Sequence, residues 1–191
     1  MDSLVDDEPL AHVVAVADEL FFTYGVHAVT MQRIRSEAGV PLKKLYGMFP
    51  SKDALLAACL ERRDVIARSA LADRAEKSDD PVERVLSVFD FLDDWFRQPG
   101  FHGCVFAGAF GEAGAAAPVV VSAVQAHKQS LRELVTGLVA RTEVRHPDAV
   151  GAQLAVLFDG AMALATFTGD TDAARHAREA AQTVLAAALR D

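Results

Sequence analysis

The chain has 191 residues, of which 51% are hydrophobic and 24% are charged, a balance typical of a soluble globular protein with a sizeable core. With 19 basic and 27 acidic side chains, the formal net charge is −8. This excludes a general polyanion-binding protein, so any nucleic-acid surface must be a local patch. The two cysteines, Cys59 and Cys104, are too few for a disulfide framework or a cysteine-rich zinc module.

We expect no targeting or membrane segment in this sequence. Its first twenty residues are acidic and interrupted by charge, which does not fit a secretory signal. No uninterrupted apolar run approaches the roughly 20 residues that are needed to cross a bilayer. We therefore expect a soluble cytoplasmic protein with no membrane partner.

Apolar residues recur at helical spacing almost everywhere, and no convincing alternating strand is found. In the first part of the chain, helices are expected over residues 10–24, 30–38, 41–49 and 51–66. The expected breaks are Gly25, Gly39 and Pro50, and the expected N-caps are Thr30 and Ser51.

Further helices are expected in the rest of the chain, which has no internal repeat and no long disordered linker. Asp80-Pro81-Val82-Glu83 is a compact helix start, with a cap, a proline in the first turn and an acid that can reach back. The expected helices cover residues 80–96, about 103–113, 118–142, 147–168 and 172 to the end, the last capped by Asp170-Thr171-Asp172. About nine helices without a strand predict an all-α fold, with a compact N-terminal three-helix unit joined to a larger bundle.

The stretch TMQRIRSEAGVPLKKLYGMFPSKDALL, residues 30–56, carries the functional signal. Two short helices joined by a tight turn at Gly39-Val40 predict a helix-turn-helix, whose second helix enters the major groove of DNA. Residues 30–52 contain five bases and one acid, a local charge of +4. On charge alone, a basic helical hairpin that only solvates one face of the protein is the simpler interpretation.

The order of the residues resembles the N-terminal domain of the TetR/AcrR family of transcription regulators over residues 10–60. The matching positions are Ala17, Leu20-Phe21, Gly25, Thr30, Ile34, Ala38-Gly39-Val40, Leu45-Tyr46, Phe49, Lys52 and Leu55. Beyond this region the chain matches the family in length and helical character, apart from Gly103-Cys104, which looks like the signature of one subgroup.

The resemblance implies a helix-turn-helix DNA-binding domain over residues 8–56, with its motif at 30–49, and a C-terminal ligand-binding and dimerisation domain over 57–191. It also implies a homodimer that binds a pseudo-palindromic double-stranded DNA operator. The expected activity is repression, relieved by an unidentified small apolar or reactive effector, with no catalytic residue, cofactor or metal.

Roles carried over from the family place the DNA contacts on both motif helices. Thr30 would cap the first helix and touch a phosphate, and Tyr46 and Lys52 would contact phosphates as well. The full set of expected DNA-binding residues is Thr30, Gln32, Arg33, Pro41, Leu42, Lys43, Lys44, Tyr46 and Lys52. The residues expected in the core of the motif are Ile34, Ala38, Val40, Leu45 and Phe49.

The motif departs from the family pattern at several positions. A serine or threonine is usual at Pro41 and a small residue at Lys43, so a polar contact is lost and a charge is gained. Gly47 costs a helix about 1 kcal/mol relative to alanine. Met48 replaces an aromatic residue and Arg35 a small one. These departures affect the operator sequence more than the DNA-binding role.

Seven of the fourteen aromatic residues fall within residues 89–110 and could line a ligand cavity, although ordinary packing between helices also explains them. The expected ligand-binding residues are Trp95, Phe101, Cys104, Phe106, Phe110 and Phe158. Cys104 lies near a helix start, where exposed amides could stabilise a thiolate that senses electrophiles or oxidants. A small buried hydrophobic residue is the alternative role for Cys104, and Cys59 on an apolar stripe is expected to be packing.

Small side chains form one face of each of the last two helices, and the family resemblance implies that these helices pair with their mates in the dimer. The two faces consist of Ala149, Gln153, Val156, Leu157, Gly160 and Leu164, and of Ala177, Ala181, Val184 and Ala188. The core of a monomeric bundle is the alternative use of both faces.

An enzyme is the rival class of function. The six histidines are scattered without metal-ligand spacing, and no nucleophile elbow, phosphate-binding glycine loop or matched carboxylate pair is found. An all-α small-molecule-binding protein or enzyme with a non-functional helix-turn-helix remains the alternative.

Overall fold

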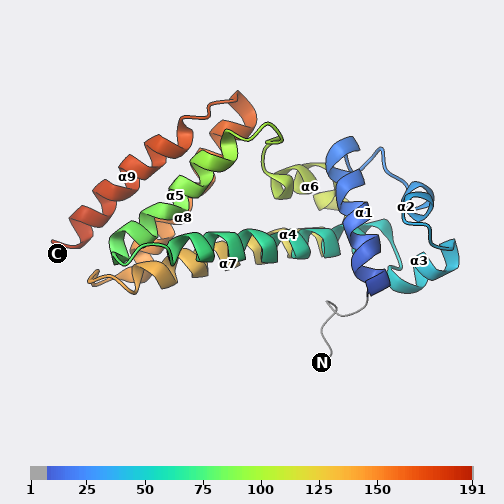
Figure 1. The fold of residues 1–191 in the computed structure, drawn as a ribbon, viewed down its shortest axis with the longest axis horizontal. Helices are drawn as coiled ribbons and strands as arrows, with labels where there is room; N and C mark the ends of the chain where they lie inside the picture. Colours follow the sequence, from blue (N-terminus) through green and yellow to red (C-terminus); the bar gives the residue numbers. More distant parts are fainter. Residues whose placement is uncertain (1–7, 191) are drawn as a thin grey trace. The chain divides into compact units, whose positions relative to one another are not determined.

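The computed structural model describes residues 8–190, apart from the side chain of Ala115. The described residues contain no strand, which confirms the predicted all-α fold (Figure 1). The helices are α1 (Glu8–Tyr24), α2 (Met31–Glu37), α3 (Leu42–Met48), α4 (Lys52–Ala75), α5 (Pro81–Phe96), α6 (Val105–Ala113), α7 (Pro118–Val139), α8 (Pro147–Thr168) and α9 (Ala173–Ala188), with a 3₁₀ turn η1 (Gly114–Ala116).

Side-chain caps start several helices where the sequence predicts them. Thr30 Oγ1 accepts a hydrogen bond from the backbone N–H of Arg33 at 3.2 Å and caps α2. Ser51 caps α4 in the same way, and Asp80 accepts bonds from two backbone N–H groups of α5. These side chains satisfy N–H groups that have no partner within the helix.

Two other predicted caps are not formed as expected. Glu83 does not reach back to the start of α5, because its carboxylate pairs with Arg178 of α9 at 2.8 Å. At the start of α9, Asp170 accepts a bond from the backbone N–H of Asp172, whose own carboxylate makes no cap bond. The Glu83 and Asp172 carboxylates instead pair with arginines distant in sequence, Arg178 and Arg97.

The chain divides into two compact units. The first comprises residues 1–64 and 105–126, and the second residues 65–104 and 127–191. Helices α4 and α7 contribute to both units. The division into functional domains at residues 56 and 57 stays a prediction.

The first unit is closed by α4 packing against α1. Phe21 and Leu56 are almost fully buried, and the Cys59 thiol lies 3.5 Å from the carbonyl oxygen of Val14. Burial raises the pKa of the Cys59 thiol well above its ordinary value. Cys59 is therefore a packing residue, as predicted.

A charged pair also links α1 and α4 at the edge of this core. Asp18 is only 8% exposed, and its Oδ1 lies 2.6 Å from Nε of Arg63. The Arg63 guanidinium in turn lies over the ring of Phe22, 3.7 Å from its centroid. A charge this well buried requires such a partner, because desolvation alone would disfavour it.

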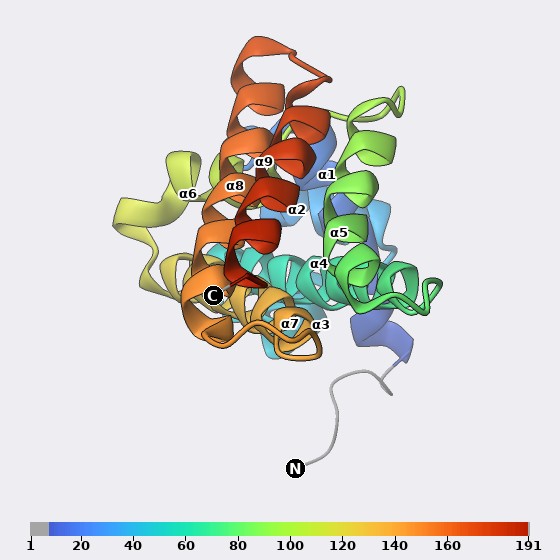
Figure 2. The ribbon, with the colours of Figure 1, turned by 90° about the vertical axis from the view of Figure 1, so that its left-hand side faces the viewer.

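In the second unit, α9 lies against both α8 and α5 (Figure 2). Phe89 of α5, Leu154 of α8 and Leu185 of α9 are almost completely buried in the shared core. By length and composition α8 could cross a membrane, but several of its residues belong to this core. The core helix of a soluble protein passes the same test, so the observation is weak evidence for a membrane span.

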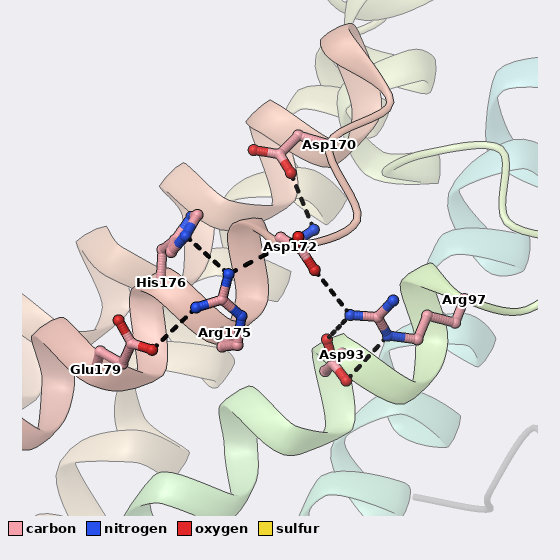
Figure 3. Close-up of polar contacts among 7 residues, drawn as sticks. All are labelled: Asp93, Arg97, Asp170, Asp172, Arg175, His176 and Glu179. Atoms are coloured by element: carbon pink, nitrogen blue, oxygen red, sulfur yellow. Dashed lines mark hydrogen bonds and ion pairs between the residues drawn. The ribbon is translucent and has the colours of Figure 1, made fainter.

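A polar network ties the end of α5 to the start of α9 (Figure 3). Arg97, the C-cap of α5, donates to Asp93 of that helix and to Asp172 Oδ1 at 3.0 Å. Arg175 pairs with Asp172 and Glu179. The hydrogen bond from Arg97, assisted by the charge of Arg175, lowers the pKa of Asp172. The hydrogen bonds to Asp93 and then Asp172 raise the pKa of Arg97.

Candidate nucleic-acid interface and ligand region

Helices α2 and α3 form the predicted helix-turn-helix. Gly39 has a positive φ of 64°, and the backbone N–H of Val40 donates to the carbonyl of Arg35 at 3.1 Å. This left-handed residue lets the chain reverse direction at the end of α2, which a side chain at Gly39 would disfavour. Ile34 and Leu45 are fully buried and hold the two helices together.

The predicted core of the motif is confirmed with one exception. Ala38 and Phe49 are each 7% exposed and therefore buried. Val40, in the turn between the two helices, is only half-buried. Its position was predicted from the family pattern and not from a helical stripe.

The leading face of α3 is open to solvent. Lys43 and Lys44 are exposed, Leu42 is 38% exposed and Tyr46 is 48% exposed. Pro41 precedes the helix without a side-chain cap bond, and Thr30, the N-cap of α2, and Gln32 of α2 are also exposed. A Cβ added at Gly47 would meet nothing within 4 Å, so this glycine leaves open space on α3.

The two other expected DNA-binding residues already have partners inside the protein. The Arg33 guanidinium lies over the ring of Tyr24 of α1, 3.8 Å from its centroid. Lys52 Nζ donates to the carbonyls of Val26 and Val29 at 3.0 and 3.2 Å. Both side chains therefore help to hold α1, α2 and α4 together, independently of any contact with DNA.

The expected ligand-binding residues are divided between the two units. Trp95, Phe101, Cys104 and Phe158 belong to the second unit, whereas Phe106 and Phe110 belong to the first. The Trp95 and Phe101 rings meet edge to face with their centroids 5.6 Å apart. The centroid of the Phe158 ring lies 6.4 Å from that of Phe89. Phe106 is buried and Phe110 is 51% exposed. The four residues of the second unit thus pack on or within its hydrophobic core.

The backbone before α6 is fixed against α8 next to Cys104. Gly103 has φ +90°, and a Cβ there would lie 2.5 Å from Cγ2 of Thr166. Thr166 Oγ1 accepts from the backbone N–H of Cys104 at 3.1 Å and donates to the carbonyl of Met162. Gly103-Cys104 therefore has a steric reason for its glycine, and the half-buried Cys104 is held in place by its backbone.

Two family models match most of the chain. Residues 13–59 match the bacterial regulatory proteins of the tetR family, and residues 81–181 match the tetracyclin repressor-like C-terminal domain. The chain belongs to the TetR family. It is therefore a DNA-binding transcriptional regulator with a TetR-type helix-turn-helix.

Solved structures agree with this assignment to the TetR family. The chain is 32% identical to a TetR-family transcriptional regulator from Streptomyces coelicolor, with a TM-score of 0.81 and coverage of 96% of this chain and 91% of that one. A protein assigned as a TetR transcriptional regulator of Streptomyces avermitilis is 28% identical, with a TM-score of 0.80 and coverage of 95% and 98%. The reduced form of NemR from E. coli is 20% identical, with a TM-score of 0.78 and coverage of 91% and 96%, and shows the shared fold. No curated protein matches the chain.

The small-residue faces predicted on the last two TetR helices have different environments. On α9, Ala177 and Ala181 are buried in the core of their own unit, and Val184 and Ala188 pack against it. This face of α9 is thus used within the chain, contrary to the expectation that it meets a mate. On α8, Gln153, Val156, Gly160 and Leu164 are exposed, and the stripe continues to Phe167, which is 77% exposed.

One polar contact of the first unit was not predicted from the sequence. Glu112 of α6 accepts a hydrogen bond from the backbone N–H of His27 through Oε2 at 3.1 Å. The two residues are 85 positions apart, and neither lies in a motif. No local signal in the sequence could have paired them. In the part of the chain that the structure describes, no group of three or more potential metal ligands is found.

Proposed function

We propose that the protein is a dimeric repressor that binds a pseudo-palindromic operator through the leading face of α3. The observation that carries the proposal is the exposure of Lys43 and Lys44 beside Leu42 and Tyr46 on a short helix whose other side is buried. Lysines supply phosphate or guanine contacts, Leu42 can pack on a thymine methyl, and the Tyr46 hydroxyl can donate to a phosphate. Membership of the TetR family supports DNA as the target and the cytoplasm as the location. We propose no catalytic role.

Selection of random duplex DNA by the purified protein tests this proposal. We expect recovery of a pseudo-palindrome whose affinity falls steeply as salt rises, since phosphate contacts release counterions. Weak binding that ignores sequence, by a protein shown to be folded, would contradict the operator proposal.

The dimer is proposed to form around the exposed stripe of α8. Val156 is 71% exposed, Leu164 50% and Phe167 77%, and these three residues lie on one side of the helix. Burying such large apolar side chains against a second copy stabilises a dimer, and the mate supplies the second recognition helix.

Val156→Asp tests the dimer proposal by sedimentation. We expect the variant to shift towards monomer, because a carboxylate would be buried in an apolar interface. Val119→Asp is the matched control, since Val119 is also an exposed valine, 45% exposed, but lies on α7. An unchanged dimer in the Val156 variant, or equal dissociation in both variants, would contradict an interface at this stripe.

The effector is proposed to be a small apolar or reactive molecule that binds in the second unit and releases the operator. The pair of Trp95 and Phe101 rings and the half-buried Cys104, which all pack against the core of this unit, support this class of ligand. Alkylation of Cys104 well above the rate of a free thiol, with loss of operator binding that Cys104→Ser abolishes, is expected for a reactive effector. Alkylation at the rate of a free thiol, or none at all, would remove the sensor role.

A further inference from the structure

The turn between α1 and α2, residues 25–29, is held by two side chains of opposite charge from two other helices. Lys52 begins α4, and its ammonium donates to the carbonyls of Val26 and Val29 at 3.0 and 3.2 Å. Both bonds are partly buried, and each has a charged donor. Hydrogen bonds with a charged partner are stronger than neutral ones, so Lys52 fixes the two carbonyls in place.

Glu112 of α6 binds a backbone N–H group of the same turn. Its Oε2 accepts from the backbone N–H of His27 at 3.1 Å, and a Cβ added at Gly25 would lie 3.5 Å from that oxygen. The turn therefore presents carbonyls to a cation and an N–H group to an anion. This pattern matches each backbone group to the side chain that it can bind.

The turn leads directly into the DNA-binding helices. Val29 is followed by Thr30, the N-cap of α2, and Arg33 in the first turn of α2 stacks on Tyr24 at the end of α1. Because α3 packs on α2, a shift in the turn would move the exposed lysines of α3 relative to α1. The turn is thus one of the contacts that position α2, and α3 packed on it, within the first unit.

We propose that Lys52 and Glu112 are positioning residues for operator binding, which act by bracing the α1–α2 turn. The inference rests on the proposed DNA-binding face. It differs from the phosphate contact expected for Lys52 from the family resemblance, because the bonds of Lys52 go to the backbone of its own chain. It also gives α6 a direct contact with the segment that begins α2.

The Lys52→Met variant separates the two roles of Lys52 by the salt dependence of operator binding. Methionine keeps much of the apolar stem but removes the charge. A positioning role predicts a loss of affinity of roughly threefold to tenfold with an unchanged salt slope, about the net size of one hydrogen bond. A phosphate contact predicts a slope that is flatter by about one unit for each protomer, and this result would overturn the proposal.

Amide hydrogen exchange of the protein without DNA tests the brace independently of operator binding. We expect exchange of the His27 amide to accelerate roughly threefold to tenfold in Glu112→Ala, and less in Glu112→Gln, whose amide oxygen can still accept. Lys43→Met is the control, because Lys43 is an exposed residue of α3 outside the turn, and its loss should leave exchange at His27 unchanged. Unchanged exchange at His27 in Glu112→Ala would overturn the proposal.

The two measurements distinguish failure of this inference from failure of the proposed function. If the wild-type protein selects no operator, the DNA-binding proposal fails, whereas the exchange result still decides whether the turn is braced. If Lys52→Met does not fold, Glu112→Ala supplies both the exchange rate and the operator affinity. Normal affinity together with faster exchange would also overturn the positioning role.

Discussion

The two adjacent lysines on α3 give the sharpest prediction for operator binding. Lys43 and Lys44 are both exposed, so the double substitution Lys43→Ala/Lys44→Ala removes two positive charges without opening the core. If each lysine contacts one phosphate, a dimer loses four contacts. At about 0.9 counterions per contact, the slope of log affinity against log salt becomes less steep by about 3.6.

This change in slope is large enough to measure. Between 50 and 200 mM salt, a slope difference of about 3.6 corresponds to about 150-fold less salt sensitivity in the variant. Fluorescence anisotropy titrations of a labelled operator at several salt concentrations would measure it. The circular dichroism spectrum and melting temperature should stay close to those of the wild type, because Leu45, which packs α3, is unchanged.

A variant with the same change in net charge provides the control. Lys77→Ala/Arg145→Ala also removes two positive charges, and both of these residues are exposed outside the helix-turn-helix. Its salt slope should match that of the wild type. Equal slopes for the wild type and the α3 variant, or equal flattening in both variants, would refute the assignment of phosphate contacts to α3.

Three further predictions concern the stability of the fold. Gly103→Ala should destabilise the protein by about 1–3 kcal/mol through backbone strain alone. The clash of the new methyl group with Cγ2 of Thr166 should lower the free energy of unfolding further. In chemical denaturation, the double variant Gly103→Ala/Thr166→Ser should recover the loss due to the clash but not the loss due to strain. Asp80→Ala should lower the free energy of unfolding by about 1 kcal/mol, because α5 loses its cap; an unchanged urea midpoint would contradict this. The lowered pKa of Asp172 means that its contribution to stability is present at pH values above its ordinary pKa of 3.8 and is lost as the pH falls through its folded value. The urea midpoint, measured at a series of acidic pH values, should therefore fall less in Arg97→Ala than in the wild type. An equal fall in both proteins would contradict the role of the Arg97–Asp172 pair.

The helices were predictable because their boundaries depend on local chemistry. Thr30 and Asp80 cap the helices that the sequence assigned to them, and Pro118 and Pro147 begin α7 and α8. Gly39 reverses the chain because its left-handed conformation suits a residue without a side chain. Each of these signals acts within a few residues, so one sequence is enough to find it.

The partners of the charged side chains were not predictable from the sequence. Glu83 pairs with Arg178 and Glu112 with the His27 backbone, and each pair joins segments far apart in the chain. Lys52 shows the same limit within the candidate site: the motif located the residue, but its hydrogen bonds depend on where the α1–α2 turn lies. Long, flexible charged side chains can reach many partners, and only the folded geometry selects one.

The small-residue face of α9 could not be assigned for a different reason. Alanines at helical spacing allow close packing of any neighbouring helix, whether it belongs to the same chain or to a second copy. Ala177 and Ala181 are used inside the chain, whereas the exposed residues that remain for a partner are mostly on α8. Amphipathic spacing identifies a packing face but not the helix that covers it.

The buried thiol of Cys59 offers a way to measure transient opening of the first unit. Because the thiol is fully buried against α1 and its pKa is raised, we expect it to ionise and react with a thiol reagent only when α1 separates from α4. In a Cys104→Ser background, the rate of labelling would measure the free energy of that separation under native conditions. Comparing this rate with and without operator DNA would show how strongly DNA binding holds the α1–α4 contact closed.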